Sequence, residues 1–293
     1  MRKIAICALS LGAMCAAGLW ITRPQSLDPS SLENLVPDAA RGEVIFAAMG
    51  CASCHTADGE EDPRVLAGGH AFKTEFGTFY APNISTDPIH GIGTWSDLDI
   101  ANAILKGTSP AGSHYYPVFP YPSYGRAELT DIADLTAYLR TLPASSTPNK
   151  AHEVAFPFQF RVALGGWKLL FFNTDFVING DLTPEQQRGR VLVEALAHCG
   201  ECHTPRNALG GPDLSQWLAG GPAQTGPGKI PDIRPQTLQW SQRDIVEYLT
   251  SGFTPDYDSA GGEMADVIEN TSKLPESDRQ AIAAYLLIDR EAP

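Results

Sequence analysis

The sequence predicts an all-α protein of two tandem domains that are related by internal duplication and contain long ordered loops. A five-residue cysteine motif occurs twice, and other short strings recur at offsets of about 145 to 152 residues, as expected of a repeat. The 293 residues are 43% hydrophobic and 19% charged, which is a globular composition. The 27 Gly and 23 Pro predict long loops between a modest number of helices.

The net charge limits the kind of partner. Lys and Arg number 21 and Asp and Glu number 34, so the formal net charge is −13. A protein that binds nucleic acid needs a basic face for the phosphates, so we expect no nucleic-acid partner. The acidic excess suits a solvated surface, or a surface that steers a basic partner.

The N-terminus carries an export segment in residues 1–25. Arg2 and Lys3 precede an apolar run at residues 4–21, and this order is typical of exported proteins. As a helix the run would be roughly 27 Å long, which suits either a cleaved signal peptide or an uncut membrane anchor. Both alternatives place the rest of the chain in the periplasm, either soluble or attached to the cytoplasmic membrane by the N-terminus.

Four of the six cysteines belong to the repeated motif C-x-x-C-H. Residues three apart share one face of a helix, so both thiols can reach the two vinyl groups of one porphyrin, and the following histidine can bind the iron. A redox dithiol would need a βαβ context, and a zinc site or two disulfides would not need a histidine after each pair. The sequence therefore predicts two covalently bound haem c groups, with thioether links and proximal iron ligands at Cys51, Cys54, Cys199, Cys202, His55 and His203.

The repeats divide the exported chain into a first domain at residues 36–148, an aromatic-rich segment at 149–182 and a second domain at 183–290. Each domain is predicted to contain a helix, the haem motif, a long loop, a helix, a loop and a final helix. Asp97 and Ser241 lie at the starts of the middle helices, where a side-chain oxygen can cap free backbone N–H groups. The matching strings are Arg41-Gly42 with Arg188-Gly189, Leu66-Ala67-Gly68-Gly69 with Leu218-Ala219-Gly220-Gly221, Trp95-Ser96 with Trp240-Ser241, and Ala137-Tyr138-Leu139 with Ala284-Tyr285-Leu286.

This arrangement resembles class I cytochrome c. In that family a glycine and an aromatic residue, four positions apart on the first helix, cross an aliphatic–aromatic pair on the last helix. The resemblance implies that Gly42 and Phe46 meet Leu135 and Tyr138 in the first domain. Glycine suits such a crossing because it lets two helix backbones approach closely. The residues at the same places in the second domain are Gly189, Val193, Ile282 and Tyr285.

The sixth iron ligand differs between the two halves. A methionine sulfur often lies opposite the histidine and raises the haem potential. Met264, just before the last helix, is the predicted distal ligand of the second haem. The repeat offset places Phe119 at this position in the first domain, and phenylalanine cannot bind iron. His114 is the nearest candidate ligand there; the alternatives are a hydrogen bond from its ring to a propionate or to the backbone, an open iron, or ligation by His70 or His90.

Several longer strings identify a family more specifically than the haem motif does. They are FGTFYAPNI at 76–84, GIGTWSD at 91–97, YPVFPYPSY at 116–124, WKLLFF at 167–172, residues 198–207 and GGEM at 261–264. With them the chain is similar to the dihaem and trihaem cytochrome c subunits of periplasmic alcohol, sugar, sugar-acid and aldehyde or N-heterocycle dehydrogenases. The resemblance implies a subunit without catalytic activity of its own, which accepts electrons from a dehydrogenase and passes them to a terminal oxidase or another cytochrome. In that family a methionine lies at the position of Phe119 or near Ala127, and this chain has neither.

Two interpretations of the function stay open. The first is electron transfer by both haems. The second is a haem enzyme, peroxidase-like or a small-molecule oxidoreductase, or a ligand sensor, which uses an open first haem with His114 as the acid–base group. The aromatic segment 149–182 is predicted to pack across both domains; the alternative is an exposed patch that docks a dehydrogenase or lies on the bilayer surface.

Overall fold

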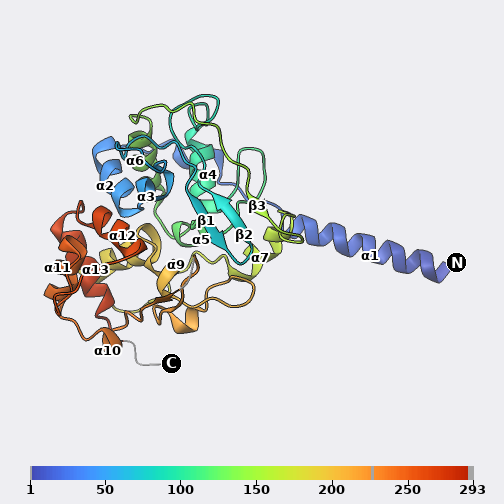
Figure 1. Ribbon diagram of the computed structural model, residues 1–293. Coiled ribbons are helices and arrows are strands. Elements are labelled where there is room, and N and C mark those ends of the chain that lie inside the picture. The colour runs from blue at the N-terminus through green and yellow to red at the C-terminus, as the bar shows by residue number, and fades with distance from the viewer. Residues whose placement is uncertain (1, 226–227, 290–293) are drawn as a thin grey trace.

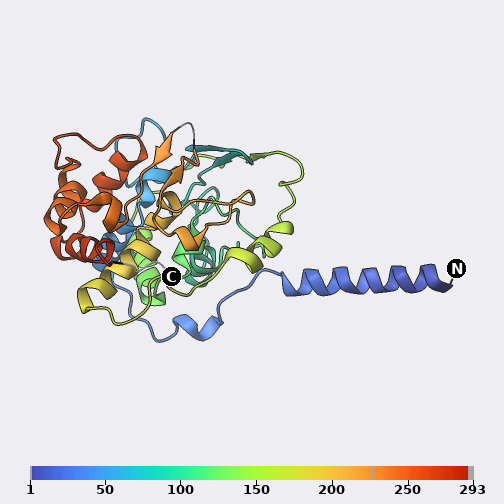
Figure 2. The same ribbon diagram turned by 90° about the horizontal axis from the view of Figure 1, so that it is seen from below.

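The computed structural model describes residues 2–225 and 228–289, which form two helical domains packed side by side (Figure 1). Residue 1 of the predicted export segment and residues 226, 227 and 290 of the predicted second domain lie outside the described residues. Helix α1 (Arg2–Ile21) projects from the body of the protein, as Figure 2 also shows from below. A short 3-10 helix, η1 (Pro29–Leu32), precedes the first domain.

Both domains have the predicted order of helix, haem motif, long loop and further helices. The helices of the first domain are α2 (Ala39–Ala48), α3 (Cys51–His55), α4 (Asp97–Lys106), α5 (Tyr121–Tyr124) and α6 (Leu129–Leu139). The helical elements of the second domain are α8 (Pro184–Val191), the π-helix η2 (Leu192–Leu196), α9 (Cys199–His203), the 3-10 helix η3 (Leu214–Gln216), α10 (Pro235–Leu238), α11 (Gln242–Ser251), α12 (Glu263–Thr271) and α13 (Glu276–Leu286).

The first and last helices of the first domain cross at a glycine, as the sequence predicts. A Cβ atom on Gly42 would lie 2.0 Å from the carbonyl oxygen of Asp134 and 2.8 Å from the Cβ atom of Tyr138, so α2 and α6 touch through their backbones. The ring of Phe46 packs against Tyr138 with their centroids 5.2 Å apart. A larger side chain at Gly42 would therefore force the two helices apart.

The second domain has the same crossing between α8 and α13. A Cβ atom on Gly189 would lie 2.0 Å from the carbonyl oxygen of Ala281 and 2.7 Å from the Cβ atom of Tyr285. Val193 and Ile282 are both buried in the core beside this crossing. The predicted crossing is confirmed in both domains, and the glycine contact is nearly identical in the two.

An arginine next to each crossing glycine binds an aspartate on the last helix. Arg41 donates to both carboxylate oxygens of Asp134 at 2.7 and 3.0 Å, and Arg188 donates to those of Asp278 at 3.0 and 2.7 Å. The aspartate side chains are only 6% and 11% exposed. Paired donors in this geometry fix the register of the crossing as well as adding electrostatic attraction.

The middle helices begin at serine caps. Ser96 and Ser241 each form a capping box, with Asp99 and Asp244 respectively, at the starts of α4 and α11. The prediction was correct for Ser241 and wrong for Asp97. Asp97 is the first helical residue, and its carboxylate accepts a hydrogen bond from Arg140 at 2.9 Å, because the preceding serine already occupies the capping position.

The fold is mostly helical, and its loops contain short strands. One antiparallel sheet joins β1 (Ala71–Thr74) and β2 (Gly77–Tyr80) of the first domain with β3 (Glu153–Val154) of segment 149–182, and the second domain holds β4 (Gly221–Pro222) paired with β5 (Lys229–Ile230). Both sheets lie in the loops next to the haem motifs. Backbone groups that pack against a core need hydrogen-bond partners, and these strands supply them.

The segment between the domains packs against both. Within α7 (Ala163–Phe171), Trp167 donates through Nε1 to the carbonyl of Leu209 at 2.9 Å, and Lys168 donates through Nζ to the carbonyl of Lys106 at 2.6 Å. The segment therefore bridges the second and first domains. It also exposes large apolar side chains to solvent, and these are Phe156, Phe158, Phe160, Val162, Leu169 and Leu170.

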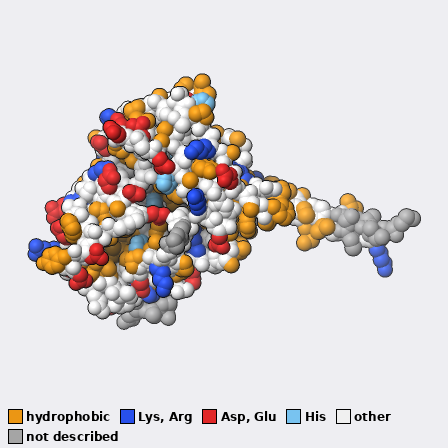
Figure 3. Space-filling model, in the orientation of Figure 1, with side chains coloured by type: hydrophobic (Ala, Val, Ile, Leu, Met, Phe, Trp, Pro, Cys, Tyr) orange, Lys and Arg blue, Asp and Glu red, His pale blue; other side chains and the backbone are white. Residues whose placement is uncertain are grey.

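Helix α1 leaves the body beside this segment. The carbonyl of Thr22 lies so close to α7 that a Cβ atom on Gly165 would be 2.1 Å from it. Hydrophobic side chains cover the described part of α1 and its root, as Figure 3 shows. Over the part of the chain that the structure describes, we find no helix with both the length and the apolar character needed to cross a membrane.

Candidate haem sites

Each haem motif forms one short helix that starts after a residue with left-handed backbone. Gly50 precedes α3 with φ 61°, and His198 precedes α9 with φ 42°. This bend ends the preceding helix and directs the motif towards the interface between the domains. The structure joins none of the four motif cysteines, Cys51, Cys54, Cys199 and Cys202, in a disulfide.

The two motif histidines make the same hydrogen bond. Nδ1 of His55 lies 2.8 Å from the carbonyl oxygen of Pro82, and Nδ1 of His203 lies 2.9 Å from that of Pro231. A carbonyl only accepts, so Nδ1 carries the proton and Nε2 keeps the lone pair with which a histidine binds a metal. Burial lowers the pKa of both imidazoles, which favours the neutral form that a metal requires.

A glycine in each domain fixes the loop that carries the proline. The backbone N–H of Gly68 donates to the carbonyl of His55, and that of Gly220 donates to the carbonyl of His203, both at 2.7 Å. Both glycines have φ near 70°. A Cβ atom on Gly68 would lie 2.5 Å from the carbonyl carbon of Pro82. Glycine is therefore required where the motif histidine and the proline loop meet.

Sequence reasoning found the repeated Leu-Ala-Gly-Gly strings without assigning them a role, and it missed both prolines. The signal was present, because Pro82 follows its motif histidine by 27 residues and Pro231 follows its own by 28. A proline at nearly the same distance in two repeats could have been read as part of the site.

The thiols lie in an environment that favours their neutral form. Burial raises the pKa of Cys51 and Cys199 to about 12. Burial, assisted by the charge of Glu263, raises the pKa of Cys54 and Cys202 to about 11. A neutral thioether fits such a site, whereas a zinc ion needs thiolates. Among the described residues no group of three or more His, Cys, Asp and Glu side chains is placed to hold a metal ion.

The two predicted distal positions, Met264 and Phe119, lie in different surroundings. Met264 is the second residue of α12 and is partly buried against the core of the second domain. Phe119, at the corresponding place in the first domain, lies in a cluster of aromatic rings. Its centroid is 5.8, 6.4 and 5.9 Å from those of Tyr115, Tyr121 and Tyr124. These contacts hold the phenylalanine ring in place. The ring itself has no atom that can bind iron.

The structure places His114 at the root of α1. The ring is 5% exposed, and its Nε2 donates to the carbonyl of Thr22 at 2.9 Å. This contact agrees with the backbone hydrogen bond that was the alternative to iron ligation. Nδ1 of the same ring is buried and has no hydrogen-bond partner. His70 is more exposed, and its Nδ1 lies 3.3 Å from the carboxylate of Asp58.

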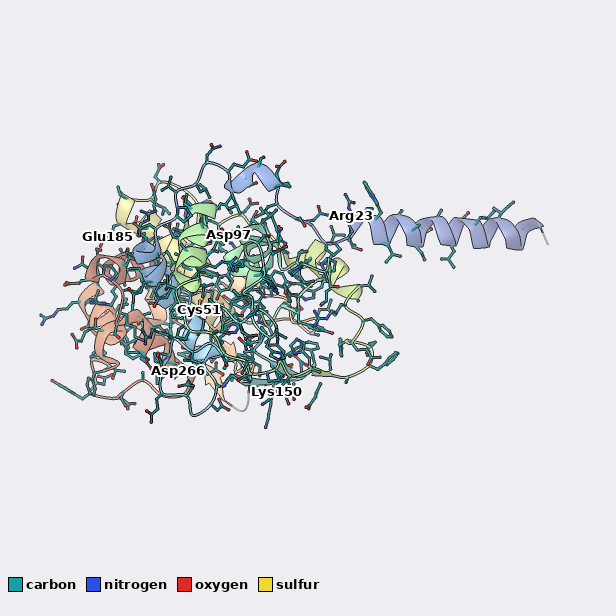
Figure 4. The ribbon with its side chains drawn as sticks, turned by 90° about the horizontal axis from the view of Figure 1, so that it is seen from above. Arg23, Cys51, Asp97, Lys150, Glu185 and Asp266 are labelled. Atoms are coloured by element: carbon teal, nitrogen blue, oxygen red, sulfur yellow. The ribbon has the colours of Figure 1, made fainter. Side chains whose placement is uncertain are left out.

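The two motifs come together where the domains meet. In Figure 4 Cys51 lies on α3 of the first domain and Asp266 on the neighbouring α12 of the second. The negative charges of Glu263 and Asp266 act on the thiol of Cys54 across this boundary, and the thiol of Cys54 in turn acts on that of Cys202. Two hydrogen bonds between the domains also end on the motifs themselves, where Ser53 and Glu201 are the acceptors.

Comparison with known proteins gives the family. The family model for cytochrome c matches residues 39–143 and 186–288. The chain is 57% identical over 289 residues to a diheme cytochrome c-type protein of Cereibacter sphaeroides, with 98% of both chains covered. Over 272 residues it is 36% identical to the fructose dehydrogenase cytochrome subunit of Gluconobacter japonicus, covering 90% of this chain and 55% of that protein.

A third relative is the cytochrome c subunit of a quinone-type alcohol dehydrogenase of Gluconobacter oxydans, which is 35% identical over 260 residues. This match covers 84% of the chain and 53% of that protein, so the chain spans about half the length of the two dehydrogenase subunits. The matched regions each contain one complete C-x-x-C-H motif. The chain therefore belongs to the cytochrome c family, with two tandem cytochrome c domains and two covalently bound haem c groups.

Proposed function

We propose that this protein is a dihaem electron carrier that takes electrons from a periplasmic dehydrogenase and passes them to a terminal oxidase or another cytochrome. The observation that carries the proposal is the meeting of two equivalent haem motifs at one domain interface. The names of the dehydrogenase-subunit relatives support the electron donor. The relatives do not identify the oxidised substrate, because this chain matches only about half of each.

In this proposal the chain holds, orients and tunes its haems. Cys51 and Cys54 bind the first haem, Cys199 and Cys202 bind the second, and the motif histidines are the proximal ligands. Met264 is the distal ligand of the second iron. Each bound haem supplies reversible one-electron chemistry. The carbonyls of Pro82 and Pro231 orient the histidines and increase their donor strength, because an N–H that donates to an acceptor makes the ring more basic.

The proposal leaves the distal ligand of the first haem unassigned. His114 is the residue to test first, and ligation through Nε2 would require that nitrogen to release Thr22. The aromatic cluster around Phe119 favours a second candidate function, in which an open first iron binds a small ligand or performs peroxidase-like or other oxidoreductase chemistry. A spectrum of the ferric protein separates the two functions. Two low-spin haems support the carrier, and a high-spin haem that binds cyanide supports the second function.

We further propose a periplasmic location, with an N-terminus that stays attached to the cytoplasmic membrane. His114 and Gly165 hold Thr22 at the end of α1, so the root of this helix is part of the packed structure. The apolar side chains exposed on segment 149–182 lie next to that root. Fractionation of cells tests the proposal: the full-length protein is expected with the membranes, and release by salt alone would contradict an anchor.

We also propose that the two domains, at residues 36–148 and 183–290, arose by duplication. The matched crossings at Gly42 and Gly189 support this, as do the arginine–aspartate pairs and the histidine–proline bonds. Segment 149–182 would then be the connection added between the copies.

The electron-transfer role is tested by reconstitution. The purified oxidised protein is mixed with a candidate periplasmic dehydrogenase, and the substrate of that dehydrogenase is added. Both haem bands are expected to become reduced, and the protein without dehydrogenase should stay oxidised. Reduction by the substrate without any dehydrogenase would contradict the carrier role and favour an enzyme.

A further inference from the structure

A hydrogen bond links the first haem motif to the second domain. Nδ2 of Asn270 in α12 donates to the hydroxyl oxygen of Ser53 at 2.7 Å, and Ser53 is the third residue of the Cys-Ala-Ser-Cys-His motif. The Asn270 side chain is nearly buried and also donates to the carbonyl of Asp266 within its own helix. It packs 3.8 Å from where a Cβ atom on Gly50 would lie. The amide is therefore held in one orientation by both domains.

The helix that donates this hydrogen bond also carries Met264. Helix α12 is nine residues long, with Met264 at its start and Asn270 near its end. Its last residue, Thr271, donates to the carbonyl of Leu249 at 2.8 Å and so ties that end of the helix to α11. An α-helix this short is stiff, so a displacement at Asn270 is carried to the methionine end.

The other motif makes the mirrored contact. Ser123 in α5 donates to a carboxylate oxygen of Glu201 at 2.6 Å, and Glu201 is the third residue of the Cys-Gly-Glu-Cys-His motif. Helix α5 directly follows Phe119, the distal position of the first domain. Each haem motif therefore uses its third residue to bind the segment that follows the other domain's distal position. The same connection made twice argues against an accidental contact.

We propose that Ser53 is a positioning residue for the distal methionine of the second haem, acting through Asn270 and helix α12. The inference rests on the proposed role of Met264 as an iron ligand. It means that the attachment helix of the first haem and the sixth ligand of the second are mechanically coupled. A change at the first haem motif then alters the second haem without touching any residue of the second domain.

The test uses the dihaem protein and follows the thioether–iron absorption band at the red end of the spectrum, which reports only a methionine-ligated haem. Imidazole is titrated as a competing ligand. Ser53→Ala is expected to raise the apparent affinity of the methionine-ligated haem for imidazole by about two- to tenfold, the effect of losing about one net hydrogen bond. Ser53→Thr keeps the hydroxyl and should retain the wild-type affinity.

A double-mutant cycle shows whether the effect passes through the bond. Asn270→Ala should raise the imidazole affinity as much as Ser53→Ala does. The double variant should bind imidazole no more tightly than either single variant, because the contact can be lost only once. Ser272→Ala is the matched control, since that hydroxyl lies next to α12 and donates only to the carbonyl of Glu269. Mass spectrometry confirms that every variant carries both haems.

The outcomes separate this inference from the proposed function. If Met264→Ala abolishes the band while Ser53→Ala leaves both the band and the imidazole affinity unchanged, the ligand assignment stands and the coupling is refuted. If the band survives Met264→Ala, the ligand assignment itself fails, and the coupling fails with it. Equal effects of Ser53→Ala and the Ser272→Ala control would also overturn the coupling.

Discussion

Replacing Gly220 with alanine tests how the second proximal histidine is held. The new Cβ atom would lie 2.5 Å from the carbonyl oxygen of Ile230 and 2.6 Å from the carbonyl carbon of Pro231, where 3.4 Å begins ordinary contact. The Pro231 loop must therefore retreat by roughly 0.8 Å to reach normal packing distance. If His203 stays in place, such a shift lengthens its 2.9 Å bond to Pro231 to as much as about 3.7 Å, beyond the limit of about 3.5 Å.

The cost of this change has two parts. A residue other than glycine at a φ of 70° costs about 1 kcal/mol, and the weakened hydrogen bond costs about 1 kcal/mol more. We therefore expect the free energy of unfolding to fall by about 2 kcal/mol. Because an imidazole that loses its acceptor donates less strongly to iron, the potential of the second haem should rise. A 1 kcal/mol effect that differs between the oxidation states corresponds to about 40 mV for one electron.

Urea unfolding and a spectroelectrochemical titration measure the two effects of Gly220→Ala. The control is Gly221→Ala at the adjacent position, where a Cβ atom would meet its nearest neighbour, in Pro205, at an ordinary 3.5 Å. If Gly220→Ala changes neither the unfolding free energy nor the potential relative to Gly221→Ala, the glycine does not position the histidine and the reasoning is wrong.

Three further predictions follow from the same structure. Met264→Ala should remove the thioether–iron band and lower the potential of one haem only, and a spectroelectrochemical titration with both potentials unchanged would rule out the ligand. Arg188→Ala leaves the nearly buried Asp278 carboxylate without its partner, so urea unfolding should show a loss of about 1–3 kcal/mol, whereas a loss below 0.5 kcal/mol would mean that solvent replaces the arginine. Burial lowers the pKa of His114 below 6.5, so the unfolded chain binds more protons and stability should fall as the pH drops through about 6.5; His114→Gln should flatten this loss in unfolding curves measured from pH 8 to pH 5.

The proximal half of each site could be predicted from local sequence, and the rest could not. Cysteines three apart followed by histidine form one helical turn wherever that turn lies, so the motif predicts its own geometry. The histidine–proline bond joins residues separated by a long loop, and only the path of that loop brings Pro82 to His55. The repeat showed only that Gly68 belongs to a string that recurs in both domains. Its role became clear from its φ and from the carbonyl packed against it.

The contacts between the domains left no signal in the sequence. Ser53 and Glu201 occupy the same place in their motifs but differ in size and charge, so the repeat does not single out either one. Their partners lie in α12 and α5, and no periodic pattern relates a serine in one domain to an asparagine more than two hundred residues later. Docking of the two domains depends on the shapes of surfaces that form only after each domain has folded.

The two domains share one arrangement around the motif histidine, and in the proposed function they differ in the distal ligand. The chemistry of the haem allows one protein to combine the two. The proximal turn has to present two thiols and an imidazole in one arrangement, so its supporting glycine and proline are the same in both halves. A distal position is free to change, because methionine, another ligand or an open iron each give a functional haem of different potential. With Met264 in one domain and Phe119 in the other, two otherwise equivalent sites are expected to differ in potential. An electron that enters at the lower-potential haem then has a downhill step within the same chain, across the interface where the motifs meet.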